Sequence, residues 1–357
     1  MGTLFKDMLA SNETLFKNEL ALDFEFVPKL IPFREQQQQY VASCIKPLFQ
    51  KRNGRNLVMH GPPGVGKTVA IRHVFRELEE TTDEVIPIFI NCWQKNTTFK
   101  IFEDMCQQLG FAFTQNKNTA ELIKIIETKT KGKGIVIAFD EIDKAEDYDF
   151  LYLLLERLLS KSILLITNFS DWLQGLDIRI KSRLVPDQIE FKAYDTKETT
   201  AILNQRLDYA FFPNVWDPSA LKIVADKTTE SKDIRAGLTI LKEAGLAAEA
   251  ASSRKILPDH ATKAWEKVAF MTPKPSEELE EDTKGILELI KKNSPSKIGD
   301  LFAIYQKEGG DCAYRTFQRK IEKLSLNKFI HVKKITGGAE GTTSIISAEN
   351  KTLDEFS

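Results

Sequence analysis

Cysteine is scarce in this sequence, and the few that occur are far apart. Cys44, Cys92, Cys106 and Cys312 include no C-x-x-C pair. This spacing excludes a disulfide framework and a cysteine-based metal site. Free thiols in a chain of 357 residues are typical of a reducing, intracellular compartment.

Long apolar runs are also lacking. No run reaches the roughly 18 residues that a membrane-spanning helix needs. Met1–Ala10 does not combine a basic start with an apolar stretch, as a secretory signal would. We therefore expect no membrane association and a cytoplasmic location.

A large net charge is the third absence. The chain has 50 Lys and Arg against 51 Asp and Glu, a net charge of −1. The whole molecule is not a polycation, so any nucleic-acid surface has to be local. The length and a 42% hydrophobic content allow two or three domains with sizeable cores.

What the sequence does contain is an alternation of strands and helices. Continuous apolar runs predict buried strands at 56–60, 85–91, 134–140 and 163–167. Stretches with helical spacing separate them, which predicts an α/β fold with a parallel sheet. After Phe191 the strands stop, and helical spacing predicts an all-helical part up to Phe270.

A further small domain is predicted at the end of the chain. Thr272–Asp282 contains prolines and an acidic stretch, which favours a linker. From Thr283 on, the pattern predicts three helices followed by a hairpin, with strands at 329–335 and 342–347 and a glycine-rich turn between them.

A phosphate-binding loop follows the first predicted strand. Residues 61–68, Gly-Pro-Pro-Gly-Val-Gly-Lys-Thr, match G-x-x-x-x-G-K-[ST]. Glycines let backbone amides converge on phosphate oxygens, and the following helix presents its positive end to the same anion. Lys67 can bridge the β- and γ-phosphates, and Thr68 can bind Mg²⁺. We therefore expect ATP/ADP and Mg²⁺ as cofactors, with loop contacts from Gly61, Pro62, Pro63, Gly64, Val65, Gly66, Lys67, Thr68 and Val69.

Polar residues stand at the ends of the third and fourth predicted strands, 134–140 and 163–167. Asp140 is expected to hold Mg²⁺, directly or through water, and Glu141 to polarise the attacking water. The alternative is that Asp140 caps the next helix. Asn168 can orient the same water, although it can also be a turn residue.

Three arginines are candidates for stabilising phosphate charge in the transition state. Arg179 and Arg183 precede a last predicted strand that includes Glu190 and Phe191, and Arg235 starts a helix in the all-helical part. Weak surface salt bridges are as common an explanation, so the residues alone leave both interpretations open.

The order of these motifs resembles that of an AAA+ ATPase. More narrowly, the chain resembles archaeal replication initiators of the origin-recognition and cell-division-cycle family. The stretches that carry this resemblance are Phe26–Lys29, Pro32–Gln36, Arg179–Leu184, Ile189–Tyr194 and Asp233–Leu238. The resemblance covers nearly the full chain.

The resemblance implies a domain order and residue roles. It implies an AAA+ base at 1–194, a helical lid at 195–271, a linker at 272–282 and a winged helix at 283–357. Asn168 becomes sensor 1, Arg235 an in-chain contact to the γ-phosphate, and Arg183 or Arg179 a finger offered to a neighbouring subunit. The region 97–129 is expected to contain a helical insertion that touches DNA. Adenine contacts are expected from Val27, Pro28, Pro32 and Arg34.

The resemblance also implies a function. The chain is expected to be a slow ATPase switch that binds duplex DNA at a replication origin and helps to load the replicative helicase. Identical or paralogous initiator subunits are further expected partners, in an archaeal, nucleoid-associated setting. The sequence departs from the family pattern just before Asp233. Members of the family commonly have a glycine there, whereas this chain has Ser231 and Lys232.

The C-terminal part supports DNA binding on its own residues. The segment from Lys284 to Lys334 contains twelve Lys and Arg but only five Asp and Glu. Around 314–324, apolar residues share one helix face and cations the other, as in a recognition helix. The expected DNA contacts are Arg315, Arg319, Lys320, Lys323, Lys333 and Lys334. A solvated amphipathic helix is the alternative.

Two other functions fit the same motifs. One is a signalling or scaffold ATPase whose C-terminal domain binds protein instead of DNA. The other is a helper ATPase for transposition or clamp loading. Binding to random duplex DNA at low salt separates the first of these from an initiator.

Overall fold

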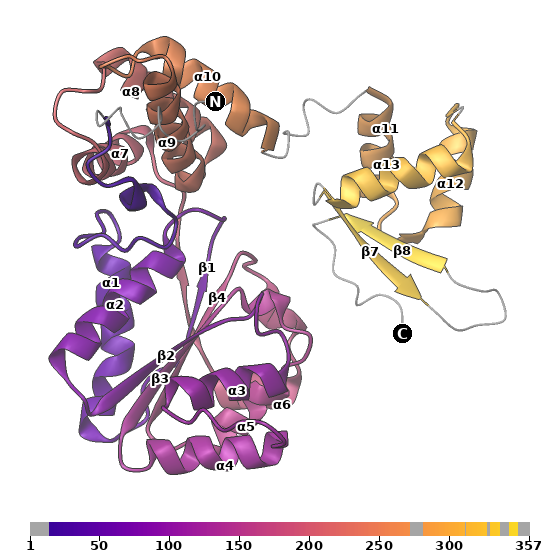
Figure 1. The fold of residues 1–357 in the computed structure, drawn as a ribbon. Coiled ribbons are helices and arrows are strands. Elements are labelled where there is room, and N and C mark those ends of the chain that lie inside the picture. The colour runs from indigo at the N-terminus through magenta and orange to yellow at the C-terminus, as the bar shows by residue number, and fades with distance from the viewer. Residues whose placement is uncertain (1–13, 272–280, 311, 327–328, 336–342, 349–357) are drawn as a thin grey trace, which may run out of the picture. The chain divides into compact units, whose positions relative to one another are not determined.

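The chain folds into two compact units, Met1–Trp265 and Glu266–Ser357 (Figure 1). The computed structural model describes residues 14–271, 281–310, 312–326, 329–335 and 343–348. Within these ranges, no helix has both the length and the apolar character needed to cross a membrane.

A parallel sheet forms the centre of the first unit. Its strands lie in the order β2-β3-β4-β1-β5, and every neighbouring pair is parallel. The strands are β1 (Leu57–His60), β2 (Val85–Asn91), β3 (Gly134–Asp140), β4 (Lys161–Thr167) and β5 (Asp187–Glu190). The predicted parallel α/β fold is confirmed, and the carboxyl ends of β1, β4 and β3 meet at one edge.

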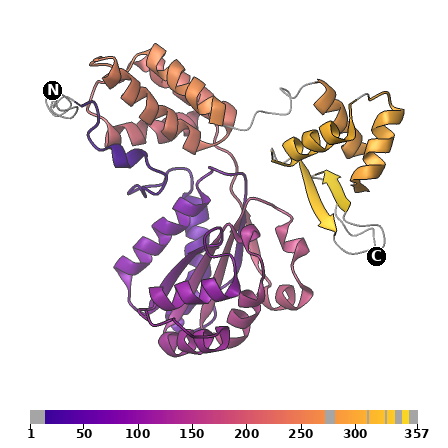
Figure 2. The ribbon, with the colours of Figure 1, turned by 45° about the vertical axis from the view of Figure 1, so that its right-hand side comes forward.

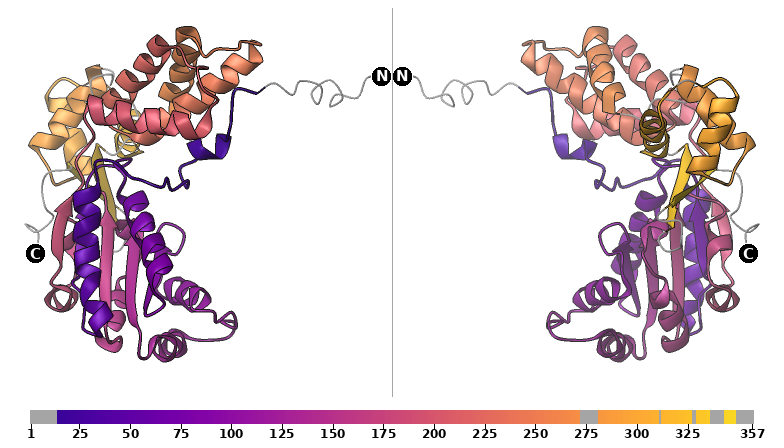
Figure 3. Two further views of the ribbon diagram at one scale, coloured as in Figure 1. Left: turned by 90° about the vertical axis from the view of Figure 1, so that its left-hand side faces the viewer. Right: turned by 90° about the vertical axis from the view of Figure 1, so that its right-hand side faces the viewer.

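Helices cover both faces of this sheet because its inner strand β3 is apolar on both sides. All seven residues of β3 are buried. Ile135, Ile137 and Phe139 belong to one core cluster, and Val136 and Ala138 to the other, as the alternation of side chains along a strand requires. The first cluster includes residues from α3 (Thr98–Gln108), α4 (Thr119–Thr130), α5 (Asp149–Arg157) and α6 (Ile178–Leu184). The second is covered by α1 (Glu35–Ile45) and α2 (Lys67–Thr81) (Figure 3).

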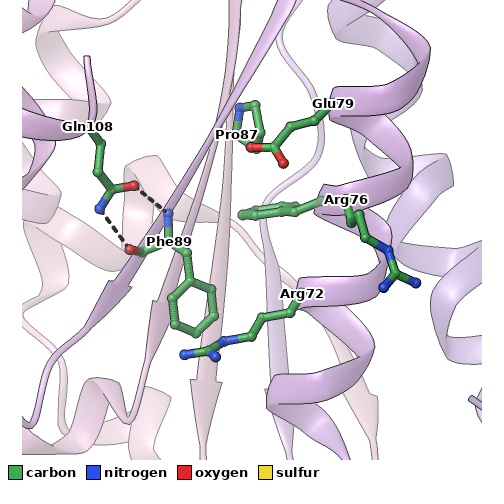
Figure 4. Close-up of a pocket in the computed structure, with 7 residues that line it drawn as sticks. Arg72, Arg76, Glu79, Pro87, Phe89 and Gln108 are labelled. Carbon is green, nitrogen blue, oxygen red and sulfur yellow. Dashed lines mark hydrogen bonds between the residues drawn. The ribbon is translucent and has the colours of Figure 1, made fainter. Parts of the chain in front are cut away.

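Strand β2 lies at the end of the sheet, and its outer edge is partly closed. The N–H of Gly134 donates to the carbonyl of Glu84. The backbone N–H and C=O groups of even-numbered β2 residues therefore point toward β3, and those of odd-numbered residues point to the open edge. Pro87 has no N–H to offer there. The amide of Gln108 takes both backbone groups of Phe89, donating to its carbonyl at 2.9 Å and accepting from its N–H at 3.2 Å (Figure 4).

Helices follow the sheet, as predicted, and form the lid. They are α7 (Thr196–Ala210), α8 (Pro218–Ser231), α9 (Ile234–Ala250) and α10 (Pro258–Met271) (Figure 2). Their starts carry strong caps. Asp195 and Glu198 form a reciprocal capping box on α7, and Asp217 caps α8 ahead of Pro218.

The N-terminal segment, residues 14–34, runs between the lid and the base (Figure 3). On the lid side, the Phe16 ring lies 4.7 Å from that of Phe211. On the base side, the carbonyl of Lys29 lies 2.8 Å from a ring nitrogen of His73 in α2. The segment therefore contacts both parts of the first unit.

Some local elements differ from prediction. Helix α1 ends at Ile45, because Pro47 has no N–H and the chain tightens into a 3-10 turn. Helix α6 was not expected. The short 3-10 turns are η1 (Glu19–Leu22), η2 (Lys46–Gln50), η3 (Ile142–Lys144) and η4 (Trp172–Gly175).

The second unit combines three helices with a small antiparallel sheet in the order β6-β8-β7, the arrangement of a winged helix. Its elements are α11 (Glu281–Lys292), β6 (Ser296–Lys297), α12 (Ile298–Lys307), α13 (Tyr314–Leu326), β7 (Ile330–Ile335) and β8 (Thr343–Ala348). The two-residue strand β6 was not predicted, and α11 begins inside the predicted linker. The glycine-rich turn at 337–341 lies outside the described residues.

Candidate functional site

The phosphate loop, residues 61–68, connects β1 to α2 at the carboxyl edge of the sheet. Gly64 and Gly66 have φ of 72° and 88°, a left-handed conformation that other residues adopt at a cost. Helix α2 begins at Lys67, so its unpaired N–H groups face the loop. The backbone therefore has the left-handed glycines and the helix start that the expected amide cradle requires.

The ammonium group of Lys67 is held by three oxygens. It donates to the carbonyls of Gly61 and Pro62 at 2.6 and 2.8 Å, and to Oδ1 of Asn168 at 2.9 Å. Burial lowers the pKa of Lys67 to about 8. Because the charged form is disfavoured by burial, an anion beside this ammonium would stabilise it.

Thr68 and Asp140 form the second contact between the loop and the sheet. The hydroxyl of Thr68 donates to Oδ2 of Asp140 at 2.8 Å. Burial raises the pKa of the Asp140 carboxyl above its ordinary value. A hydroxyl and a carboxylate at this distance are the donor set that Mg²⁺ uses beside phosphates, since it keeps several waters and takes few protein ligands. These residues fit the ion.

Glu141 follows Asp140 in an unusual backbone conformation. Its φ is 52° and ψ 46°, in the left-handed region that a residue with a side chain rarely adopts. Burial and the carboxylates of Asp140 and Asp143 raise its pKa. The side chain is half-buried, and the backbone N–H of Glu141 donates to Oδ1 of Asp140 at 3.1 Å.

Asn168 directly follows β4, the neighbour of β3 in the sheet, and its amide oxygen accepts from Lys67 as described. The residue before it, Thr167, donates its hydroxyl to Oδ1 of Asp143 at 2.9 Å. Asp143 therefore joins the segment after β3 to the end of β4. Sequence analysis missed Asp143, although a third carboxylate close behind Asp140 and Glu141 was a signal for it.

The lid contacts the phosphate loop through the start of α9. A Cβ built on Gly64 would lie 1.8 Å from Oδ1 of Asp233, and the N–H of Ile234 donates to the Gly64 carbonyl at 3.3 Å. Asp233 also caps α9 and pairs with Arg235, Nη2 to Oδ2 at 3.0 Å. Burial and Asp140 have the largest effects on the pKa of Lys67, and the positive charge of Arg235 lowers that pKa further. Arg235 therefore lies within electrostatic reach of the loop.

Two family models match the chain. One describes an AAA domain and matches residues 50–171. The other describes a Cdc6 AAA+ ATPase-type lid domain and matches residues 200–266. The first spans the sheet with both nucleotide motifs, and the second spans most of the helical part that carries Arg235.

Relatives match over most of their length. ORC1-type DNA replication protein 1 of Sulfurisphaera tokodaii is 32% identical over 283 residues, which are 74% of this chain and 70% of the relative. The chain belongs to the archaeal ORC1/Cdc6 family of replication initiators. ORC1-type DNA replication protein 2 of Methanosarcina mazei is 27% identical over 363 residues, covering 98% of this chain and 97% of the relative. The AAA+ ATPase and initiator expectations are confirmed.

Solved structures show the same fold. The Aeropyrum pernix ORC1 protein, solved in complex with DNA, gives a TM-score of 0.66 at 22% identity over 93% of both chains. The Aeropyrum pernix ORC2 protein, solved as ADPNP-ADP complexes, gives 0.67 at 17% identity over 93% of this chain and 94% of that one.

In this ORC1/Cdc6-family chain, the two finger candidates lie apart from the phosphate loop contacts. Both are on α6 and exposed. Arg179 pairs with Asp177, Nη2 to Oδ2 at 3.0 Å, and Arg183 lies 4.9 Å from the ring centroid of Tyr152. Neither contacts Lys67 or Asp140 in any described interaction. Their placement is compatible with a role toward another molecule and does not choose between them.

The expected adenine contacts are placed along the N-terminal segment. The carbonyls of Val27 and Pro28 accept from Arg76 of α2 at 3.4 and 3.2 Å, and Pro32 is half-buried. Arg34 differs from its neighbours, because it is only 4% exposed and its nitrogens are directed at backbone carbonyls.

The expected DNA-contacting insertion, residues 97–129, consists of α3, α4 and the loop between them. Both helices bury apolar residues in the sheet core. In the loop, Phe113 is 82% exposed, and the Phe111 ring lies beneath the Lys117 ammonium at 5.9 Å. Large apolar side chains are exposed both in the loop, at Phe113, and on α3, where Phe99 is 40% exposed.

The cations expected to contact DNA lie on α13 and β7. Phe317, Ile321 and Leu324 are buried in the core of the second unit, while Arg315 and Arg319 are exposed and Lys320 is half-buried. The side chains of Lys323, Lys333 and Lys334 lie outside the described residues. The described part of α13 therefore has one apolar face in the core and an outward cationic face.

Proposed function

We propose that this chain is an ATP-dependent switch that binds duplex DNA at replication origins and helps to load the replicative helicase. One observation carries the nucleotide part. The phosphate loop, the end of β3 and the end of β4 are joined by Lys67–Asn168 and Thr68–Asp140 hydrogen bonds, so a polyphosphate at the loop would reach all three.

In this proposal Lys67 and the loop amides hold ATP or ADP, and Thr68 and Asp140 hold Mg²⁺. Mg²⁺ supplies charge neutralisation at the phosphate oxygens. Glu141 accepts a proton from the attacking water, because its raised pKa makes it a better base than a solvated carboxylate. Asn168 orients that water.

Hydrolysis is slow in this proposal. The lid supplies Arg235 to the γ-phosphate, and α6 offers Arg183 or Arg179 to an identical or paralogous neighbour. An arginine that arrives only with another subunit leaves the isolated chain without part of its charge stabilisation.

The proposal assigns duplex binding to the outward face of α13 and to the hairpin. Arg315 and Arg319 are exposed, while the same helix is anchored by the buried Phe317 and Ile321. Such a helix can enter a major groove without losing its packing. The known DNA complex of the Aeropyrum pernix ORC1 protein, which shares the fold, supports this choice of partner.

The test combines nucleotide titration with anisotropy of a labelled duplex. The wild-type chain should bind ATP, and its affinity for duplex DNA should differ between ATP and ADP. Lys67→Ala should lose ATP binding. Its affinity for duplex DNA should then no longer differ between ATP and ADP. Duplex binding that is absent at low salt would favour a protein-binding C-terminal domain instead.

A further inference from the structure

Arg34 is a buried charge that the nucleotide site described above does not use. It is 4% exposed, and each of its three nitrogens donates to a backbone carbonyl. The acceptors are Val65 at 3.0 Å, Phe33 at 2.8 Å and Lys192 at 2.6 Å. Burial lowers the pKa of this guanidinium, so the fold keeps a desolvated charge at this point.

The three acceptors belong to different segments. Phe33 lies in the N-terminal segment, and Val65 lies in the phosphate loop. Lys192 lies in the connector, residues 191–195, which leads from β5 to the first lid helix. The guanidinium carbon is 3.9 Å from the ring centroid of Tyr194, also in the connector. One side chain thus joins three segments that are distant in sequence.

The connector also packs directly against the loop. A Cβ on Gly61 would lie 2.2 Å from the carbonyl oxygen of Phe191, and one on Gly66 would lie 2.8 Å from the hydroxyl of Tyr194. Movement of the connector therefore pushes on the first and last glycines of the loop.

The bond to Val65 has a consequence for phosphate binding. The Val65 carbonyl and the Gly66 N–H belong to one planar, trans peptide group, so they point in opposite directions. By holding the carbonyl, Arg34 directs the Gly66 N–H away from itself. An amide of the anion cradle is thereby oriented from behind.

We propose that Arg34 is a positioning residue that couples the phosphate loop to the lid connector. It acts through the Val65 carbonyl and the stack on Tyr194, without touching the nucleotide. This assignment differs from the adenine contact that the resemblance implies, and it rests on the proposed nucleotide binding. Nucleotide binding and connector order are then linked in both directions.

Arg206 is a matched control. It is also buried, at 7% exposed, and donates to two backbone carbonyls, those of Ala21 and Phe26. Its guanidinium carbon lies 5.1 Å from the Phe26 ring. Its acceptors are all in the N-terminal segment, so a change there tests the loss of a buried arginine without touching the loop.

The experiment compares Arg34→Lys with Arg206→Lys. Lysine keeps the charge but cannot reach three carbonyls with a planar fork. ATP affinity is measured by titration, and hydrogen–deuterium exchange of the connector is measured with and without ATP. Arg34→Lys should weaken ATP binding roughly tenfold, the loss of one hydrogen bond to a charged group. It should also remove ATP-induced protection of the connector.

Arg206→Lys should lower thermal stability and leave both readouts at wild-type values. Equal shifts in the two variants, or no shift in Arg34→Lys, would overturn the positioning role. A wild-type chain that fails to bind ATP would instead refute the proposed function.

A second pair covers the case in which Arg34→Lys does not fold. Tyr194→Leu removes the stacked ring, and Tyr194→Phe keeps it. The leucine variant should lose part of the ATP-induced protection and the phenylalanine variant should retain it. Full protection in the leucine variant would also contradict the coupling.

Discussion

The nucleotide site and the outward face of α13 are built in opposite ways. Around the phosphate loop, Lys67 and Asp140 are buried and hydrogen-bonded to Asn168 and Thr68. On α13, Arg315 and Arg319 extend into solvent. In a buried site each polar group has few possible partners, so a short sequence motif is enough to predict its chemistry. A motif on a surface helix predicts which face is polar but does not identify the molecule that binds there.

The largest expected effect is on turnover. Glu141→Gln keeps the shape of the side chain and removes the base, so hydrolysis should fall by about a hundredfold or more. ATP affinity should be unchanged. Phosphate release in single-turnover reactions measures the loss, with Glu146→Gln as the control because Glu146 is exposed and bonds to Asn96. Wild-type turnover would remove Glu141 from the mechanism.

Lys67→Ala should weaken ATP binding by about a hundredfold, the loss of charge-assisted bonds worth roughly 3 kcal/mol. Calorimetric titration measures it. Lys161→Ala is the matched control, because Lys161 also donates to a carbonyl, that of Leu158 at 2.8 Å, but lies at the other end of β4. If both variants bind ATP alike, the loop is not the phosphate site.

The buried site should also respond to pH where the surface does not. The pKa of Lys67 is about 8, and a bound polyphosphate raises it. Above about pH 8 binding therefore takes up a proton, and affinity should fall by up to about tenfold per pH unit. Titrations between pH 7 and 10 test this. Lys67→Arg, which stays charged, should show a flat profile over that range.

The smallest effect concerns α13. Arg319→Glu should weaken duplex binding about fivefold, a surface ionic contact of roughly 1 kcal/mol. It should also reduce the slope of log affinity against log salt by about one. Lys307→Glu on α12 makes the same charge change on the same unit. Identical salt slopes for the two variants would mean that α13 contributes only net charge.

The sequence predicted the sheet well because burial leaves a clear pattern. The predicted strands at 85–91 and 134–140 coincide with β2 and β3, since both are apolar runs bounded by polar residues. The helices of the lid follow from apolar spacing and from caps such as Asp195. In each case local preference and tertiary burial agree.

Other features depend on contacts between distant residues. Strand β6 has two residues and exists only because β8 pairs with it. Helix α6 is short, with cations on its outer face, so its apolar pattern is weak. The contacts of Asp143 with Thr167 and of Asp233 with Gly64 join segments that only the fold brings together. The position of Arg34 behind the loop, with Val65 and Lys192 as acceptors, has no signature in a linear motif.

The outer edge of β2 has a practical consequence. Exposed edges are templates on which a foreign strand can add itself. Pro87 has no N–H donor at this edge. The carboxamide of Gln108 forms with the N–H and carbonyl of Phe89 the hydrogen bonds that a neighbouring strand would form. Replacing Gln108 with leucine would remove this contact and leave both backbone groups of Phe89 able to pair with a strand of another copy.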